Sequence, residues 1–411
     1  MKFESDEIQN LCLGIYDGPH ATPPITDNGA IFLGISNITK DGHFNFSDIH
    51  YISEEDLPKW TRRVVPQEGD IVFSYEATLN LYGIIPQNFR GCLGRRMALI
   101  RPDNEKVLGK YLYYYFFSKK WRDLIQENTI TGSTVDRIPL IRFPSFKIDY
   151  PGIDVQTRII DILSAYDDLI ENNQKQIKLL EEAAQRLYKE WFVDLRFPGH
   201  EQTKIVDGVP EGWNIQLFSQ IFTYTRGRSY SSSDIVEDKS AGVLLVNLNN
   251  IKPFGGYKRN AEKIYIGKVN ANQFVDAGDI VMGVTDMTQE RRLVGQVAIV
   301  PNFERKATFS MDLIKVEPFV IPKSYIYASL RFGGYSNRIS QLANGVNVLH
   351  LKPESIMNIK MLVPHTTILK VFDEFFSNHF KKVEILENQI NMLTEARDRL
   401  LPKLMNGEIE V

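Results

Sequence analysis

The sequence contains one internal repeat, and this repeat limits the possible folds more than any local motif does. At a constant offset of 213 residues, identical residues recur in one register for more than fifty positions. The matched pairs include Gly132/Gly345, Val135/Val348, Lys147/Lys360, Pro151/Pro364, Gln176/Gln389 and Leu187/Leu400. A repeat of this length predicts two copies of one structural unit.

Each copy ends in a segment with the pattern of a long helix. No Pro or Gly occurs between Val155 and Trp191, and apolar residues there fall in three adjoining heptad rows. The second copy repeats this pattern between Phe372 and Leu404. So wide an apolar stripe needs a partner helix, and we therefore expect the two helices to form an antiparallel intramolecular coiled coil.

The parts between the helices have the pattern of short strands. Apolar runs bounded by Gly, Asp or Pro predict strands at Ile31–Ile35, Ile71–Phe73, Met97–Ile100, Val243–Val246, Ile280–Met282 and Leu313–Val316. The expected fold class is α+β, with two tandem α/β-type domains, two long helices and a pseudo-twofold repeat. The expected boundaries are 1–150 and 197–364 for the globular domains, and 151–196 and 365–411 for the helices.

The sequence carries no recognisable catalytic or metal-binding motif. Phosphate-binding, dinucleotide-binding, zinc-protease and serine-hydrolase patterns are missing, and the seven His residues have no metal-ligand spacing. The two Cys residues are too few for a disulfide framework. No run approaches the ~18 apolar residues of a membrane span. These patterns predict a non-catalytic binding protein without a metal site.

Charge is balanced overall but locally uneven. The chain has 48 Lys and Arg against 51 Asp and Glu, yet residues 86–122 hold nine basic residues and only Asp103 and Glu105. Such a basic island, which includes Arg95 and Arg96, is able to follow the phosphates of a nucleic acid. The alternative is an ordinary solvated surface, and the sequence leaves both open.

Several motifs resemble those of one known family. They are the run Asp167-Asp168-Leu169-Ile170-Glu171-Asn172-Asn173, the pair Trp191-Phe192, and the C-terminal Gly407-Glu408-Ile409. The region from Asp154 to Phe197 resembles the central conserved region of the specificity (S) subunits of type I restriction–modification enzymes, and the C-terminal segment resembles their distal conserved region. Asp17-Gly18-Pro19-His20 and Pro210-Glu211-Gly212-Trp213 resemble the starts of their two target-recognition domains.

The resemblance implies a function and a set of partners. Each recognition domain would read one half of a bipartite site in double-stranded DNA, with the helices as spacer. Two DNA adenine methyltransferase subunits and restriction/translocase subunits would bind the chain, which would lie in the cytoplasm of a prokaryote. No cofactor is expected in this chain, whereas S-adenosylmethionine, ATP and Mg would belong to the partners. The alternative function is a two-ended coiled-coil scaffold that binds proteins and has no DNA specificity.

Three surfaces are candidates for DNA contact, because polar groups after strands and in Gly-containing loops suit base edges and phosphates. The strand motif Gly69-Asp70-Ile71-Val72 recurs as Gly278-Asp279-Ile280-Val281, and the first surface follows these two strands. Its candidates are Tyr75 and Thr78 in the first copy, and Thr285, Gln289, Arg291 and Arg292 in the second copy. The second is the pair of loops with Gly132, Ser133 and Thr134 and with Gly345 and Asn347. The third contains Arg226, Arg228, Lys258 and Arg259. For each, an exposed turn or solvated loop is the alternative.

Apolar residues near the helix ends are candidates for partner contact. Trp191, Phe192 and Leu404 would remain available if the stripes are wider than one partner helix covers. Burial against the globular domains of the same chain explains them equally well.

Overall fold

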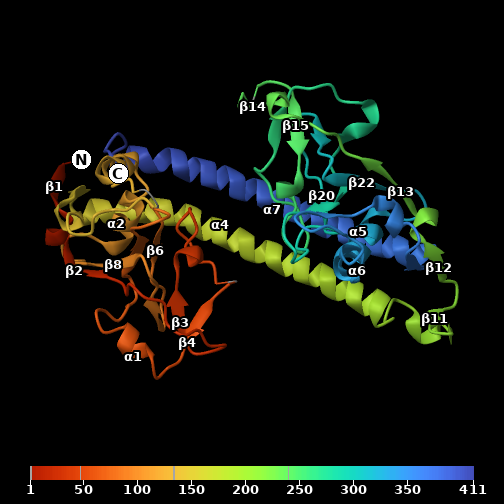
Figure 1. The fold of residues 1–411 in the computed structure, drawn as a ribbon, viewed down its shortest axis with the longest axis horizontal. Coiled ribbons are helices and arrows are strands. Elements are labelled where there is room, and N and C mark those ends of the chain that lie inside the picture. Colours follow the sequence, from red (N-terminus) through yellow and green to blue (C-terminus); the bar gives the residue numbers. More distant parts are fainter. Residues whose placement is uncertain (1, 47, 133–134, 239) are drawn as a thin grey trace. The chain divides into compact units, whose positions relative to one another are not determined.

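The computed structural model describes residues 2–46, 48–132, 135–238 and 240–411 (Figure 1). The chain forms two compact units, one of residues Met1–Asn172 with Gln389–Val411 and one of residues Asn173–Asn388. The long helices α4 (Ile153–Tyr188) and α7 (Thr366–Met405) each contribute a segment to both units. Both predicted helices are thus present, and the α+β fold class is confirmed.

The first unit contains two main sheets. One has the antiparallel order β2–β8–β5–β6, and the other has the order β4–β3–β7, in which β3 and β7 are parallel. The strands are β1 (Phe3–Glu7), β2 (Cys12–Asp17), β3 (Ala30–Leu33), β4 (His50–Ile52), β5 (Ile71–Ser74), β6 (Tyr82–Ile84), β7 (Gly91–Leu93), β8 (Met97–Pro102) and β9 (Lys147–Pro151). The short helices are α1 (Leu57–Trp60), α2 (Gly109–Tyr115) and α3 (Lys119–Asn128).

The second unit repeats this topology. Its antiparallel sheet has the order β13–β22–β18–β20, and its second sheet, β14–β16–β15–β21–β17, again contains one parallel pair, β15 and β21. The strands are β10 (Ile205–Val206), β11 (Val209–Pro210), β12 (Asn214–Leu217), β13 (Phe222–Arg226), β14 (Ile235–Val236), β15 (Val243–Val246), β16 (Lys263–Tyr265), β17 (Phe274–Val275), β18 (Ile280–Gly283), β19 (Thr285–Asp286), β20 (Val297–Ile299), β21 (Ala307–Phe309), β22 (Leu313–Pro318), β23 (Leu349–His350) and β24 (Lys360–Val363). Its short helices are α5 (Lys323–Phe332) and α6 (Tyr335–Ser340).

The order of strands identifies equivalent elements in the two units. Strands β2, β8, β5 and β6 correspond to β13, β22, β18 and β20, and the pair β1–β9 corresponds to β12–β24. Asp17-Gly18-Pro19-His20 begins at the end of β2, whereas Pro210–Trp213 precedes β12. The two motifs therefore occupy different places in the repeat, and the element equivalent to the end of β2 is the end of β13.

Each helix segment shares a hydrophobic core with the sheets of its own unit. In the first unit, Ile159 and Leu163 of α4 lie in one cluster with Leu401 and Leu404 of α7. In the second, Phe192, in the single π-helical turn after α4, lies 4.9 Å from Phe372 of α7 between ring centroids. The start of α4 thus packs with the end of α7 in the first unit, and the segment that follows α4 packs with the start of α7 in the second, so the two helices run antiparallel.

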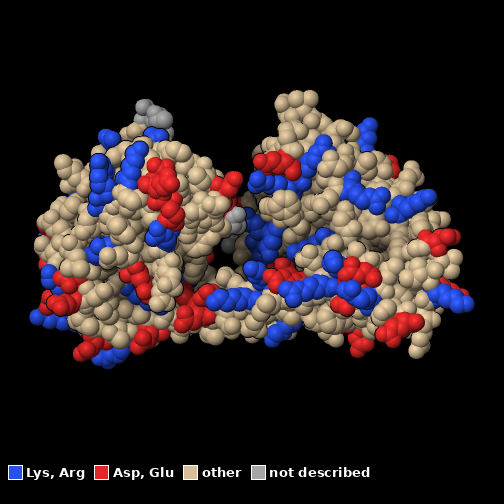
Figure 2. All heavy atoms as spheres, turned by 90° about the horizontal axis from the view of Figure 1, so that it is seen from below, with Lys and Arg blue, Asp and Glu red and all other residues tan. Residues whose placement is uncertain are grey.

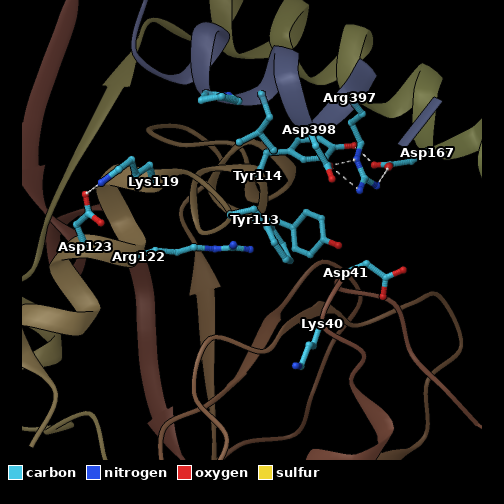
Figure 3. A pocket seen from close by; sticks show the side chains of 13 residues that line it. Lys40, Asp41, Tyr113, Tyr114, Lys119, Arg122, Asp123, Asp167, Arg397 and Asp398 are labelled. Carbon is cyan, nitrogen blue, oxygen red and sulfur yellow. Dashed lines mark hydrogen bonds and ion pairs between the residues drawn. The ribbon is translucent and has the colours of Figure 1, made fainter. Parts of the chain in front are cut away.

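A carboxylate of α4 links three elements of the first unit. Asp167 accepts a hydrogen bond from Nη1 of Arg397 on α7 at 2.7 Å and one from the Tyr114 hydroxyl on α2 at 2.5 Å. Figure 3 shows Arg397 between Asp167 and Asp398 in the wall of a cavity of about 530 Å³. In the second unit, Glu181 of α4 pairs with Arg331 of α5 at 3.3 Å. In each unit a carboxylate of α4 therefore contacts the globular part, Asp167 through the Tyr114 hydroxyl and Glu181 through Arg331.

We predict that replacing Arg397 with Gln destabilises the first unit. The change leaves the mostly buried Asp167 carboxylate without its cation, which is expected to cost about 1–3 kcal/mol. Calorimetry should show a lower melting temperature, and hydrogen exchange should become faster in α2 and the end of α7. Asp168→Asn is the matched control, because this neighbouring carboxylate is exposed. Equal stability of the two variants would contradict the assigned role.

Candidate nucleic-acid interface

The loop after β5 is held against the segment that carries the first glycine loop. The N–H of Ile138 donates to the carbonyl of Tyr75 at 2.7 Å, and the N–H of Ala77 donates to Asp136 at 3.0 Å. Ala77 has a φ of 71°, which turns the chain back at the tip. The first and second candidate surfaces are therefore adjacent in this unit.

The glycine loops share one close backbone approach. A Cβ atom on Gly132 would lie 2.5 Å from the carbonyl oxygen of Val135, and one on Gly345 would lie 1.9 Å from that of Val348. Gly345 also has a φ of 150°, which side-chain-bearing residues rarely adopt. Ser133 and Thr134 lie outside the described residues. The recurring glycine is thus explained by backbone packing, which leaves the neighbouring side chains free to differ.

The same two surfaces meet in the second unit. Strand β19, after β18, pairs with β23, which follows the Gly345 loop. The side-chain amide of Gln289 donates to the carbonyl of Val346 at 2.7 Å, and Arg291 Nη1 donates to the carbonyl of Ser340 at 2.5 Å. Asn347 is exposed on the glycine loop. In both units, the loop after the repeated strand therefore packs on the repeated glycine loop.

Asp286 holds the 287–294 loop of the second unit in place. Its carboxylate is 1 % exposed and accepts hydrogen bonds from the N–H groups of Leu293 at 2.7 Å and Thr288 at 2.9 Å. Burial alone would raise the pKa of Asp286, but these hydrogen bonds outweigh it and lower the pKa. The exposed tip from Met287 to Glu290 is thus supported from inside by one buried carboxylate.

The structure separates exposed candidates from internal ones on the first surface and among Arg95 and Arg96 of the basic island. Thr78 and Arg95 are exposed. Arg96 is half-buried with its Nε 3.0 Å from Glu76, and Arg292 lies 2.5 Å from Glu290. Two candidates are buried: Tyr75, which packs in the core beside Asp17, and Thr285, whose hydroxyl donates to Asp312. Tyr75 and Thr285 therefore belong to the loop's support and not to its exposed face.

The third surface also contains both exposed candidates and candidates that are engaged within the chain. Arg226 pairs with Glu354 at 2.8 Å, and the Arg228 guanidinium lies 5.0 Å from the centroid of the Tyr265 ring. Lys258 is exposed. Arg259 is 15 % exposed and pairs with Glu387 of α7 at 2.8 Å. Arg259 is thus a link to the helix, which corrects its assignment to the exposed surface.

The comparisons with known proteins agree with this architecture. Residues 25–182 match the family model of the type I restriction modification DNA specificity domain. Both the family model and the relatives make the chain similar to the specificity subunits of type I restriction–modification enzymes. It is 26 % identical over 375 residues to the type I restriction enzyme MjaIX specificity subunit of Methanocaldococcus jannaschii, covering 88 % of this chain and 82 % of that protein.

Two further members of the specificity family match nearly the whole chain. The MjaVIII specificity subunit of the same organism is 21 % identical over 387 residues, covering 90 % of this chain and 87 % of that protein. The crystal structure of an S subunit from M. genitalium matches with a TM-score of 0.56 at 15 % identity, covering 98 % of this chain and 96 % of that one. At this identity, the structural match supports the fold alone.

Two of the three candidate partner-binding residues are buried in the hydrophobic cores of the two units. Phe192 packs among Tyr325, Phe372 and Trp213, and Leu404 is fully buried in the first unit. Trp191 is half-buried against the second core. Of the two alternatives that the sequence left open, burial within the same chain holds for Phe192 and Leu404, because its globular parts cover these positions.

The basic island is largely neutralised by carboxylates, several of which lie far away in the sequence. Lys and Arg are interspersed with Asp and Glu on the face that Figure 2 shows. The ion pairs of the island are Arg90–Glu54, Arg96–Glu76, Arg101–Asp70, Lys106–Asp103, Lys119–Asp123 and Lys120–Asp149.

Among the described helices, none combines the length and apolar composition needed to cross a membrane.

We predict that Asp286→Asn loosens the 287–294 loop. The amide keeps the size of the side chain but loses the charge that strengthens its hydrogen bonds, at an expected cost of about 1–3 kcal/mol. Because the folded pKa is lowered, this stabilisation is present above the unfolded pKa of about 3.9 and disappears as pH falls through the folded pKa. Hydrogen exchange of the loop should be faster at neutral pH. Exchange that matches the wild type would exclude the bracing role.

Proposed function

We propose that this chain is the DNA sequence-recognition subunit of a type I restriction–modification complex. The observation that carries the proposal is the paired loop surface, which recurs in both units although its exposed residues differ. Each unit would read one half of a bipartite site in double-stranded DNA. The similarity to type I specificity subunits supports this role.

The exposed loop residues have the chemistry of base recognition. Arg292 is suited to guanine and Gln289 to adenine, because these side chains match the hydrogen-bonding edges of those bases. Met287 and Val346 are 72 % and 89 % exposed beside them and suit the methyl group of thymine. Thr78 and Arg95 would serve the first half-site, and Arg228 and Lys258 would contact phosphates.

The chain would act without catalytic groups of its own. We propose that two DNA adenine methyltransferase subunits bind it and use S-adenosylmethionine, and that restriction/translocase subunits use ATP and Mg in the cytoplasm of a prokaryotic cell. Because Phe192 and Leu404 are buried, the exposed apolar residues of the helices are the better candidates for these contacts. They are Leu169, Leu179, Val193, Val371, Ile385 and Met392.

We predict that Gln289→Ala and Arg292→Ala each relax recognition at one base of a half-site. Loss of a base-edge contact should cost about 1–3 kcal/mol of affinity for the cognate duplex, whereas loss of a phosphate contact should weaken all sequences alike. Binding is measured with duplexes in a salt series, and specificity is measured by sequencing methylated sites in cells. Arg186→Ala on α4 is the matched control, because this arginine is exposed in the same unit. Unchanged specificity in both loop variants would remove this loop from the site.

We predict that the helices set the distance between half-sites. Four residues inserted near Asn173 would lengthen α4 by ~6 Å and rotate the later part of the helix by ~40°, without changing either loop surface. Each half-site should keep its bases while the preferred gap changes, or methylation should fail. The matching insertion near Leu386 should act alike, because the repeat makes the positions equivalent. A wild-type gap with full methylation would show that something other than these helices sets the distance.

A further inference from the structure

The first unit contains a pocket that none of the three candidate surfaces includes. It has a volume of about 360 Å³ and lies between the segment after β2 and the end of α1. Asp17 to Ala21 form one side, and Lys59, Trp60 and Arg62 to Val64 form the other. The motif Asp17-Gly18-Pro19-His20, whose role the recognition loops do not explain, thus forms part of this pocket.

Positive charge predominates in this pocket. Its cationic side chains are Lys59, Arg62 and Arg63, and its one carboxylate is Asp17. Arg63 is used internally, because its Nη1 lies 3.2 Å from the Asp17 carboxylate and donates to the carbonyl of Gly18 at 2.8 Å. Within the described part of the chain, Lys59 and Arg62 form no ion pair. Two positive charges therefore remain available to a ligand.

The pocket adjoins the proposed recognition loop. Tyr75, the first residue of the loop after β5, has its hydroxyl beside the Asp17 carboxylate. The N–H of the same tyrosine donates to the carbonyl of Arg96, next to the exposed Arg95. A duplex that reached the loop would therefore bring its backbone close to the cations of the pocket.

Cations recur at the equivalent place in the second unit. Gly18 follows β2 and donates its N–H to the carbonyl of Met97 at 2.9 Å, and Gly227 follows β13 and donates to that of Leu313 at 3.1 Å. Met97 and Leu313 begin the equivalent strands β8 and β22. Arg226 and Arg228 flank Gly227 in the sequence. The cations that share the pocket with Gly18 belong instead to the end of α1 and the segment after it. Both units thus place arginines at this strand end through residues that are not equivalent in sequence.

We propose that the pocket binds a phosphodiester group of the DNA backbone, held by the side chains of Lys59 and Arg62. This assignment rests on the proposed function. Guanidinium and ammonium groups form strong charge-assisted hydrogen bonds to phosphate oxygens, and such contacts set the register of a protein on a duplex without reading bases. Arg63 acts as a positioning residue, because it holds the Asp17–Gly18 segment that closes the pocket.

Duplex binding by the double variant Lys59→Gln/Arg62→Gln tests the proposal in the full chain. The slope of log affinity against log salt is negative, and each lost phosphate contact should reduce its magnitude by about 0.9. The magnitude should therefore be smaller by about 1 to 2 in the double variant. Affinity should fall alike for cognate and unrelated duplexes, and methylated sites should keep their sequence. Arg90→Gln is the matched control, an exposed arginine of the same unit paired with Glu54. A wild-type slope in the double variant would overturn the proposal.

A second measurement separates this proposal from the function on which it rests. Inorganic phosphate is titrated against the full chain, and the fluorescence change that disappears in Trp60→Phe reports occupancy of the pocket. We expect a saturable change that Lys59→Gln/Arg62→Gln abolishes. If the wild-type chain bound phosphate but no duplex, the proposed function would fail while the anion site remained. If phosphate bound and the salt slope did not change, the pocket would take a free anion and the DNA assignment would be wrong.

Discussion

Burial of the apolar stripes of α4 and α7 is the interaction on which the rest of the structure depends. In each unit, the two stripes pack on each other and also on the sheets and short helices, because all of these elements lie in one hydrophobic cluster. Fully burying a large apolar side chain contributes roughly 1.5–3 kcal/mol, and residues such as Ile159, Leu404 and Phe372 have no exposed surface. The helix segments are therefore part of each globular core.

This shared core explains how a loop surface is held at a defined place on a helix. The exposed recognition loops are built on β5 and β18, which are central strands of their sheets, and these sheets pack in the same clusters as α4 and α7. The pairs Asp167–Arg397 and Glu181–Arg331 add directional contacts to non-directional burial. The loops of each unit are therefore held in position by the same core that contains its helix segments.

The sequence predicted those features that depend on periodicity and repetition. Both long helices, the six strands and the repeat have local patterns, and each is present. Burial of individual polar residues was not predictable, because it depends on partners far away in the chain. Arg259 pairs with Glu387, and Arg101 of the basic island pairs with Asp70. Likewise, the pocket cations Lys59 and Arg62 are separated from Asp17 by two strands, so no motif joins them.

The division between supporting and exposed residues has a consequence for how such a chain can change its target. The loop supports use backbone geometry and buried groups, namely the close approaches at Gly132 and Gly345 and the carboxylate of Asp286. The exposed positions, among them Thr78, Gln289 and Arg292, contribute little to the cores. Because substitutions at exposed positions usually change stability by less than about 0.5 kcal/mol, the tips can vary while the supports stay constant. The two units of this chain already differ in this way, since they share the glycine and the strand order but not the residues that the loops expose.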